Sequence, residues 1–167
     1  MPSAVLRKFY LAFIRTKLEC CSAVWCGATR QQLLRLERVQ IEVARAIGGV
    51  RDSQAALAAA NLPTLTWRRR IHCLVLLWRL VNGDGPPFLG CLVSSLVPER
   101  GGRVLRSPHA LRFPSARTTR HLSSFLCTTI PIWNSLPSSV FASVSKSSSF
   151  KSRLTVHFSH DRFSLGI

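Results

Sequence analysis

Residues 64–83 read TLTWRRRIHCLVLLWRLVNG. Apolar side chains recur there at three- and four-residue spacing, which is typical of a helix with one buried face; they are Trp67, Ile71, Leu74, Val75, Trp78 and Val81. Three arginines, Arg68, Arg69 and Arg70, follow one another in its first turns. Basic charge near a helix N-terminus opposes the helix dipole and costs roughly 0.3–1 kcal/mol per exposed charge. A bound phosphate would offset that cost, and an ordinary solvent-exposed face is the alternative.

Two further helical patterns precede this segment. The first extends from Ala4 to about Trp25, and the second begins after a capping residue, Thr29, and ends at Gly48–Gly49. The faces expected to be buried are Leu6, Phe9, Tyr10, Phe13, Ile14 and Leu18 in the first helix, and Leu33, Leu36, Val39, Val43 and Ile47 in the second. The charged face of the second helix is interpreted as solvated; it carries Arg35, Arg38, Glu42 and Arg45. A short Ala-rich helix at 54–60 follows, capped by Asp52 or Ser53.

The chain changes character after Asn82. The turn NGDGPP at 82–87 ends the helical pattern because its prolines cannot continue a helix. Residues 98–120 carry six arginines against one acidic residue, so this stretch is expected to stay extended or mobile until it meets an anion, or to serve as a flexible linker. A helix starting at Ser123 or Ser124 should break or kink at Pro131, and Trp133 and Leu136 should anchor this region to a core. A last short helix begins at the serine cluster 147–149.

These patterns predict a mainly α fold in three segments. We expect a helical domain at 1–82, a Pro/Gly/Arg-rich linker or extension at 83–121, and a small helical segment at 122–167. The 167 residues include 47% hydrophobic and only 18% charged residues, so a core can form and wholesale disorder is excluded.

The charge balance indicates a polyanionic partner. A formal net charge of +16, from 23 basic and 7 acidic residues, attracts nucleic acid whatever the fold. A merely soluble basic protein, or one of the ribosomal type, is the alternative. No secretory signal pattern and no membrane-spanning apolar run is found, so we expect an intracellular protein in a nuclear or cytoplasmic ribonucleoprotein. The six cysteines should then be free thiols that behave as small hydrophobes.

No pattern for metal binding or nucleophilic catalysis is found. Cys20, Cys21 and Cys26 lack a partner pair at zinc-binding spacing, and the pair His157 and His160 is isolated. The residues GDGPP at 83–87 lack the Lys–Ser/Thr ending of a phosphate-binding loop.

A polymerase centre is also excluded for this chain. Such a centre needs carboxylates that hold two Mg²⁺ ions. The three aspartates, Asp52, Asp84 and Asp161, lie far apart in the sequence, and none is beside another acid. We therefore expect no enzymatic activity and no cofactor for the chain alone.

A combination of motifs nevertheless connects the chain to polymerases. WNSLP at 133–137 is followed closely by SFKSRL at 149–154, and LRKFYLAFIRTKLE (6–19), LLRLERVQ (33–40), NLPTLTWRRR (61–70), LVNG (80–83) and ARTTR (116–120) precede them in order. Together they resemble the C-terminal part of the reverse transcriptases of non-LTR retrotransposons, the LINE and jockey-like elements, from about Val5 to Phe158. The resemblance implies that residues 6–47 form part of the polymerase thumb, with the later blocks as the C-terminal extension.

The resemblance also implies a function. Fingers and palm are absent, and the parent polymerase would use Mg²⁺, so we expect a non-catalytic fragment from a truncated element or a gene model that covers only its end. It would bind RNA, an RNA–DNA hybrid or DNA, with a separate palm and fingers domain as a further partner. The cations expected to contact phosphates are Arg68, Arg69, Arg70, Arg106, Arg112, Arg117, Arg120, Lys151 and Arg153. Two alternatives are a protein-interaction module with partly exposed tryptophans (Trp25, Trp67, Trp78 and Trp133) and a decayed copy without selected activity.

Overall fold

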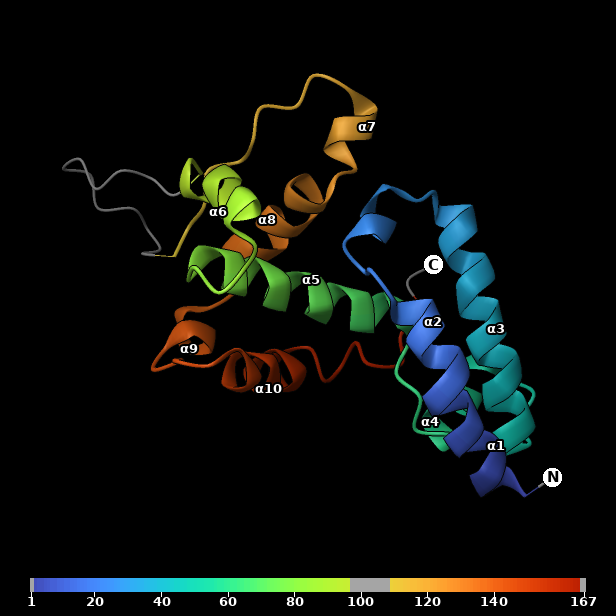
Figure 1. Ribbon diagram of the computed structural model, residues 1–167. Helices are drawn as coiled ribbons and strands as arrows, with labels where there is room; N and C mark the ends of the chain where they lie inside the picture. The colour runs from blue at the N-terminus through green and yellow to red at the C-terminus, as the bar shows by residue number, and fades with distance from the viewer. Residues whose placement is uncertain (1, 97–108, 166–167) are drawn as a thin grey trace. The chain divides into compact units, whose positions relative to one another are not determined.

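The protein is seen here in a computed structural model, which describes residues 2–96 and 109–165 (Figure 1). Helices make up 67% of the molecule, and the described residues contain no strand. The expected mainly α fold is confirmed.

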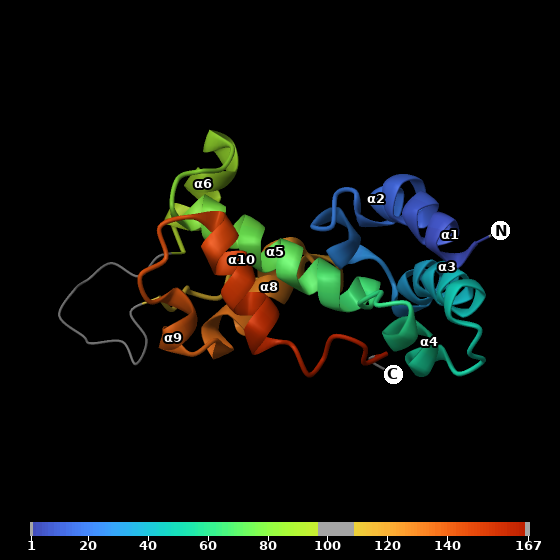
Figure 2. The same ribbon diagram turned by 90° about the horizontal axis from the view of Figure 1, so that it is seen from below.

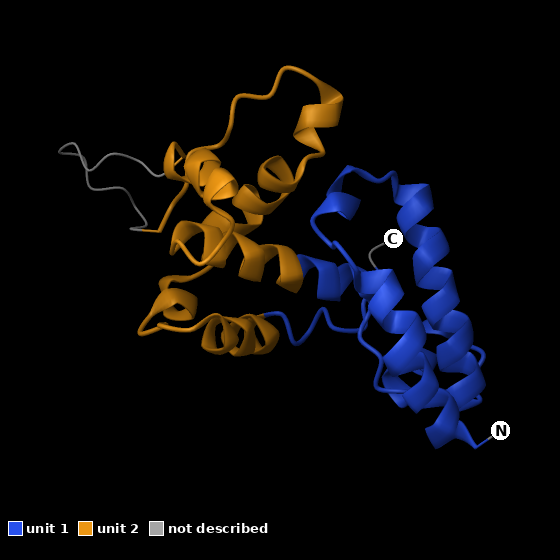
Figure 3. Cartoon of the chain, viewed as in Figure 1, with its two compact units in different colours: residues 1–70, 158–167 blue, residues 71–157 orange. Residues whose placement is uncertain are grey.

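The helices belong to two compact units (Figure 3). Unit 1 comprises residues 1–70 and 158–167, and unit 2 comprises residues 71–157. These limits differ from the three segments expected from the sequence, because the end of the chain returns to unit 1 and the boundary falls inside a helix. Unit 1 contains α1 (Ser3–Phe9), the π-helical turn η1 (Tyr10–Ile14), α2 (Arg15–Glu19), the 3-10 turn η2 (Val24–Gly27), α3 (Arg30–Gly48), α4 (Ser53–Ala59) and the start of α5 (Leu65–Val81). Unit 2 contains the remainder of α5, α6 (Pro87–Ser94), α7 (Thr119–Leu122), α8 (Phe125–Ser135), α9 (Ser138–Phe141) and α10 (Ser147–His157).

Local capping defines the ends of α3 and α4, as expected. The Thr29 hydroxyl accepts a hydrogen bond from the Gln32 amide, and the Gln32 side chain accepts one from the Thr29 amide, which is a capping box. Gly49 ends α3 with φ +66°, a left-handed conformation that glycine adopts without strain. The Asp52 carboxylate caps α4 by accepting a hydrogen bond from the Ala55 amide at 2.7 Å.

The first helix ends earlier than the sequence predicted. The continuous run of α1, η1 and α2 stops at Glu19 instead of continuing to Trp25, because Cys21 has a φ of +54° that no right-handed helix accommodates. The π-helical turn also shifts the register of the helix. Tyr10 is fully buried, whereas Phe9 and Phe13, both expected in the core, are 48% and 64% exposed.

The buried face of α3 was predicted only in part: Val43 and Ile47 pack against the core of unit 1, but none of the five expected residues is among the fully buried ones. This helix runs antiparallel to α1 and α2 (Figure 1), and its buried residues are Glu37, Gln40 and Ala44. The expected stripe lies to one side of this face, and its Val39 is 43% exposed. The core of unit 1 consists of Tyr10, Ala44, Ala56, Leu57, Ala60 and Leu62.

A buried polar pair crosses this core. The Tyr10 hydroxyl donates a hydrogen bond to Gln40 Oε1 at 2.6 Å, and Gln40 Nε2 donates one to the Pro63 carbonyl at 2.8 Å. Both side chains are fully buried. Burial raises the pKa of Tyr10 above its ordinary value, with the nearby carboxylate of Glu19 as a second cause, so the phenol stays a hydrogen-bond donor. The amide of Gln40 therefore joins η1, α3 and the chain before α5.

Unit 2 is built on aromatic contacts between α5, α8 and α10. The Phe150 ring of α10 lies 5.8 Å from Trp78 of α5 and 5.7 Å from Trp133 of α8, measured between ring centroids. The ribbons of these three helices are drawn in Figures 1 and 2. Trp133 and Leu136 are buried, as expected. Helix α8 runs through Pro131 instead of breaking there, because Ile130 and Trp133, on either side of the proline, are both held in the core.

The cysteines divide into two groups. Cys73 and Cys127 are buried and act as small hydrophobes, as expected. Cys20, Cys21 and Cys91 are instead exposed, and Cys26 is half-buried. All six are free thiols.

Gln40→Leu should lower the free energy of unfolding by about 1–3 kcal/mol for each buried group that it leaves without a partner, namely the Tyr10 hydroxyl and the Pro63 carbonyl. Urea unfolding, followed by circular dichroism, measures this change in the free energy of unfolding. Gln31→Leu, on the exposed side of the same helix, is the matched control and should change stability by no more than about 0.5 kcal/mol. Equal effects of the two substitutions would contradict the role of Gln40.

Candidate nucleic-acid interface

The start of α5 is capped by groups of the protein itself. The Glu37 carboxylate accepts hydrogen bonds from the amides of Leu65 at 2.9 Å and Thr66 at 3.2 Å. The Thr64 hydroxyl accepts a third from the Trp67 amide at 3.2 Å. Helix N-termini bind phosphate through such unpaired amides. A carboxylate from α3 therefore occupies the position that a phosphate at this helix would need.

The arginines that follow are paired inside unit 1. Arg68 makes a two-point ion pair with Glu19, in which the Arg68 Nη2 to Glu19 Oε2 distance is 2.9 Å. Arg70 Nη1 lies 3.2 Å from Asp161 Oδ2, and its guanidinium lies 5.4 Å from the centroid of the Phe158 ring. Carboxylates thus supply the negative charge that the sequence led us to seek in a bound phosphate.

Arg69 is buried next to the same helix start. Only 6% of the residue is exposed. Burial raises the pKa of Glu37 above its ordinary value, while its hydrogen bonds from Leu65 and Thr66 and the positive charge of Arg69 oppose the rise. Arg69 therefore acts on Glu37 inside the unit and presents little surface to a ligand.

The later arginines have a different environment. Arg112, Arg117 and Arg120 are exposed, and no described residue forms a hydrogen bond or ion pair with their side chains. Arg117 precedes the short helix α7, and Arg120 lies within it. Arg106 lies outside the described residues. Three of the nine predicted cations thus lie together in the sequence on one accessible segment of unit 2.

Two side chains of α8 hold the beginning of this segment. Asn134 Oδ1 accepts a hydrogen bond from the Leu111 amide, and Asn134 Nδ2 donates one to the Leu111 carbonyl, both at 2.9 Å. The Trp133 indole N–H donates to the His109 carbonyl at 2.7 Å. We call these three hydrogen bonds the Trp133–Asn134 clasp. Residues 109–111 are therefore attached to the core of unit 2, where the sequence led us to expect a stretch held only by an anion.

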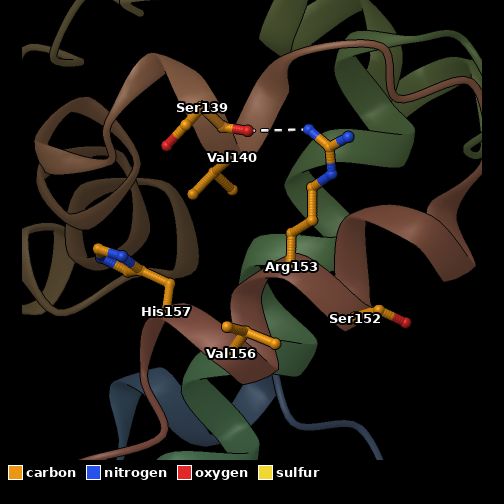
Figure 4. Close-up of a pocket in the computed structure, with 6 residues that line it drawn as sticks. All are labelled: Ser139, Val140, Ser152, Arg153, Val156 and His157. Carbon is orange, nitrogen blue, oxygen red and sulfur yellow. Dashed lines mark hydrogen bonds between the residues drawn. The ribbon is translucent and has the colours of Figure 1, made fainter.

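The two cations of α10 differ from each other. Lys151 is exposed. Arg153 Nη1 donates to the Ser139 carbonyl at 2.8 Å and to the Ala142 carbonyl, so it satisfies the end of α9 (Figure 4). The cavity beside it has a volume of about 400 Å³ and is lined by Ser139, Val140, Ser152, Arg153, Val156 and His157. Arg153 therefore has a structural role, and Lys151 stays available to a ligand.

Sequence reasoning missed the residues that bridge distant segments. Glu37 and Gln40 lie three residues apart on a helix, so they share a face, but their polarity placed that face in solvent. Asn134 was noted only as part of a motif. A second set of exposed arginines lies on α3: Arg35 and Arg38, which with Gln31 and Leu34 line a hollow of about 310 Å³. The interpretation of this charged face as solvated stays a prediction.

Neither a metal site nor a membrane-spanning helix is found within residues 2–96 and 109–165. No group of three or more His, Cys, Asp or Glu side chains in this part of the chain is arranged to hold a metal ion. None of the described helices combines the length and apolar character needed to cross a membrane.

Trp67, Trp78 and Trp133 are 7%, 5% and 2% exposed, so the expectation of partly exposed tryptophans is wrong for three of the four.

Glu37→Gln should remove part of the pH dependence of folding. A carboxyl with a raised pKa in the folded state binds its proton more tightly there, so its contribution to stability is present below the unfolded pKa of about 4.3 and is lost as pH rises through the folded pKa. The free energy of unfolding, measured from about pH 4 upward, should fall less in the variant than in the unchanged chain. Glu42→Gln, an exposed acid on the same helix, should leave the pH profile unchanged, and identical profiles for all three proteins would refute the assignment.

Arg68→Gln should destabilise unit 1, because Glu19 loses the guanidinium that neutralises it in a largely buried pair. We expect the free energy of unfolding to fall by about 1.5–3 kcal/mol, the range for hydrogen bonds to charged groups. Arg35→Gln, the same change at an exposed position of α3, should stay within about 0.5 kcal/mol of the unchanged protein. If Arg68→Gln were as stable as Arg35→Gln, the ion pair would not stabilise unit 1, and Arg68 would again be a candidate for contact with a phosphate.

Comparison with known proteins adds no relative: no protein-family model, no curated protein sequence and no solved structure matches the chain.

Proposed function

We propose that this chain is a non-catalytic nucleic-acid-binding segment that holds RNA or an RNA–DNA hybrid through the exposed cations of unit 2. The observation that carries the proposal is the accessible arginine set Arg112, Arg117 and Arg120, which follows directly after the Trp133–Asn134 clasp. Lys151, exposed on α10, is a further cation of the same unit.

Net charge by itself does not separate the two units, but the pairing of individual cations does. Residues 71–157 contain ten Lys and Arg against two acidic residues, and unit 1 contains thirteen against five, which leaves the same excess of eight basic residues in each. All five acids of unit 1 are engaged within it: Glu19, Glu42 and Asp161 pair with arginines, and Glu37 and Asp52 cap helices. In the described part of unit 2, no described residue pairs with the exposed side chains of Arg112, Arg117, Arg120 and Lys151, so their charge is available to a polyanion.

Attachment of the segment favours binding. A basic chain that is wholly free loses conformational entropy when it orders on a phosphate backbone. Here the backbone at 109–111 is already fixed by the clasp, and the Arg112 amide donates to the Leu96 carbonyl at 2.8 Å. These residues have therefore already lost conformational entropy on folding, and less entropy is lost when a ligand binds.

The arrangement favours contacts with phosphates over recognition of bases. Arginine matches phosphate oxygens with two parallel hydrogen bonds. An RNA–DNA hybrid has a near A-form shape, in which sugar and phosphate contacts dominate. We therefore assign the segment a weakly sequence-selective, salt-sensitive mode of binding.

The parent protein that we propose is the reverse transcriptase of a non-LTR retrotransposon. The motifs that carry this resemblance include WNSLP at 133–137, and its first two residues form the clasp. The chain would then belong to the thumb and C-terminal extension, without the polymerase centre.

A second candidate, contact with another protein domain, is favoured by one exposed apolar row. Val5, Phe9 and Phe13 follow at four-residue spacing, are 45%, 48% and 64% exposed, and include a ring pair with centroids 5.0 Å apart. In the proposed parent protein, a palm domain would cover such a row.

Replacing Arg112, Arg117 and Arg120 together by Gln should weaken binding to single-stranded RNA and to hybrid duplexes of different sequence by about tenfold or more. The log–log dependence of affinity on salt should become shallower by about 0.7 for each lost single-strand contact. Fluorescence anisotropy at several salt concentrations measures both quantities, and the melting temperature should not change.

Arg30, Arg35 and Arg38 replaced together by Gln form the matched control, because three exposed arginines of α3 are removed with the same loss of charge. This variant should keep most of the affinity. Equal losses of affinity in the two variants would mean that net charge alone drives binding. If neither the variants nor the unchanged chain bound nucleic acid tightly, contact with a protein domain would be left as the function.

A further inference from the structure

The turn that ends α2 brings two cysteine sulfurs together. Cys20 Sγ and Cys21 Sγ lie 3.6 Å apart, and both residues are exposed. Neighbouring side chains normally diverge, since they point to opposite faces of a strand or lie about 100° apart around a helix. Here the sulfurs converge because Cys20 is extended, with ψ 134°, and Cys21 is left-handed, with φ +54°.

Hydrogen bonds hold this turn in place. The Ser22 hydroxyl donates to the Glu19 carbonyl at 2.8 Å, and the Trp25 indole donates to the Cys20 carbonyl at 2.9 Å. The Val24 amide donates to the Cys21 carbonyl at 2.8 Å. These hydrogen bonds fix the backbone that carries the two thiols, just before the 3-10 turn η2.

We propose that Cys20 and Cys21 form an oxidation site, in which a peroxide converts the pair to a reversible disulfide between adjacent residues. The oxidant is hydrogen peroxide. Two nearby thiols alone are too few ligands for a structural metal site, which takes four, and no larger group of metal ligands exists within the described residues. Oxidation is the chemistry that needs only these two sulfurs.

The reaction has two balanced steps. In the first, the Cys20 thiolate attacks one peroxide oxygen, the O–O bond breaks, and Cys20 becomes a sulfenic acid as water leaves after proton transfer. In the second, the Cys21 thiol attacks the Cys20 sulfur, the S–S bond forms, and the sulfenic oxygen leaves as a second water with the Cys21 proton. The thiol pair loses two electrons and two protons, and one peroxide is reduced to two waters.

The order of the steps follows from the contact between the sulfurs. The hydrogen bond with Cys20 raises the pKa of the Cys21 thiol, and the charge of a Cys20 thiolate adds to the rise. Cys21 therefore keeps its proton to higher pH, which leaves Cys20 as the attacking sulfur and Cys21 as the resolving one.

The product should be easily reduced. Cα atoms of adjacent residues are about 3.8 Å apart, closer than the roughly 4.4–6.8 Å usual across a disulfide. Such a ring is strained, and strained, exposed disulfides are the labile ones. The site would consequently return to its dithiol form with ordinary cellular thiols.

The test is treatment of the full chain with hydrogen peroxide in the presence of dimedone, which traps sulfenic acids, followed by peptide mass mapping. In the unchanged chain, the peptide containing Cys20 and Cys21 should lose two hydrogens and carry little dimedone, and dithiothreitol should restore its mass. In Cys21→Ser, the resolving thiol is absent, so Cys20 should accumulate the dimedone adduct. Cys20→Ser should likewise accumulate the adduct, on Cys21, because the hydrogen bond and the charge that raise the pKa of the Cys21 thiol are lost together with Cys20.

Cys91 is the internal control. It is exposed on α6, and no described residue forms a hydrogen bond or a disulfide with its sulfur, so it should carry dimedone in every variant. Dimedone on Cys20 of the unchanged chain at the level of Cys91 would overturn the proposal. A disulfide mapped from Cys26 to either residue would overturn it too, because that pairing does not depend on the contact between Cys20 and Cys21.

Discussion

The carboxylate of Glu37, placed at the first amides of α5, is the contact on which the order of unit 1 depends. It caps a helix that begins with three arginines, and it does so from a fully formed neighbouring helix, α3. Three residues further on, Gln40 holds the Pro63 carbonyl and the Tyr10 hydroxyl. One face of α3 thereby contacts both η1 and the start of α5. Because both side chains are buried and hydrogen-bonded, replacing either one leaves polar groups without partners, a larger penalty than an apolar contact of similar size would incur.

This contact also changes how the arginines are interpreted. A triplet of arginines in a sequence looks like a phosphate site, and the same triplet beside Glu19, Glu37 and Asp161 is internally neutralised. The exposed arginines of unit 2 have no such neighbours. Acidic residues decide which cations are paired within the protein: unit 1 holds five of the seven acids, all engaged, and unit 2 holds two, although each unit keeps the same excess of eight basic residues. Basic charge alone indicates a class of partner, whereas the placement of the few acids indicates the surface that meets it.

The Trp133–Asn134 clasp gives a physical meaning to the most specific motif in the sequence. An asparagine amide offers one acceptor and one donor, which matches the amide and carbonyl of a single extended residue such as Leu111. The tryptophan fills the core of unit 2 and still uses its N–H on the His109 carbonyl. The motif residues therefore act on a segment more than twenty positions earlier. In the proposed nucleic-acid complex, that segment positions the arginines that follow it.

The sequence by itself determined the helical class, the caps at Thr29, Gly49 and Asp52, and four buried positions of α5, namely Trp67, Ile71, Leu74 and Trp78; Val81 of the expected stripe is 37% exposed. Each of these depends on residues within a few positions of one another, so local geometry and periodicity are sufficient. Only the tertiary structure decided that Phe9 and Phe13 face outward, that α3 buries Glu37 and Gln40, and that the arginine triplet is paired. Those outcomes depend on partners 23 to 91 residues away, such as Pro63 for Gln40 and Asp161 for Arg70. A polar side chain looks solvent-exposed in any local pattern until the fold brings it a partner, because burial is favourable only once its hydrogen bonds are satisfied.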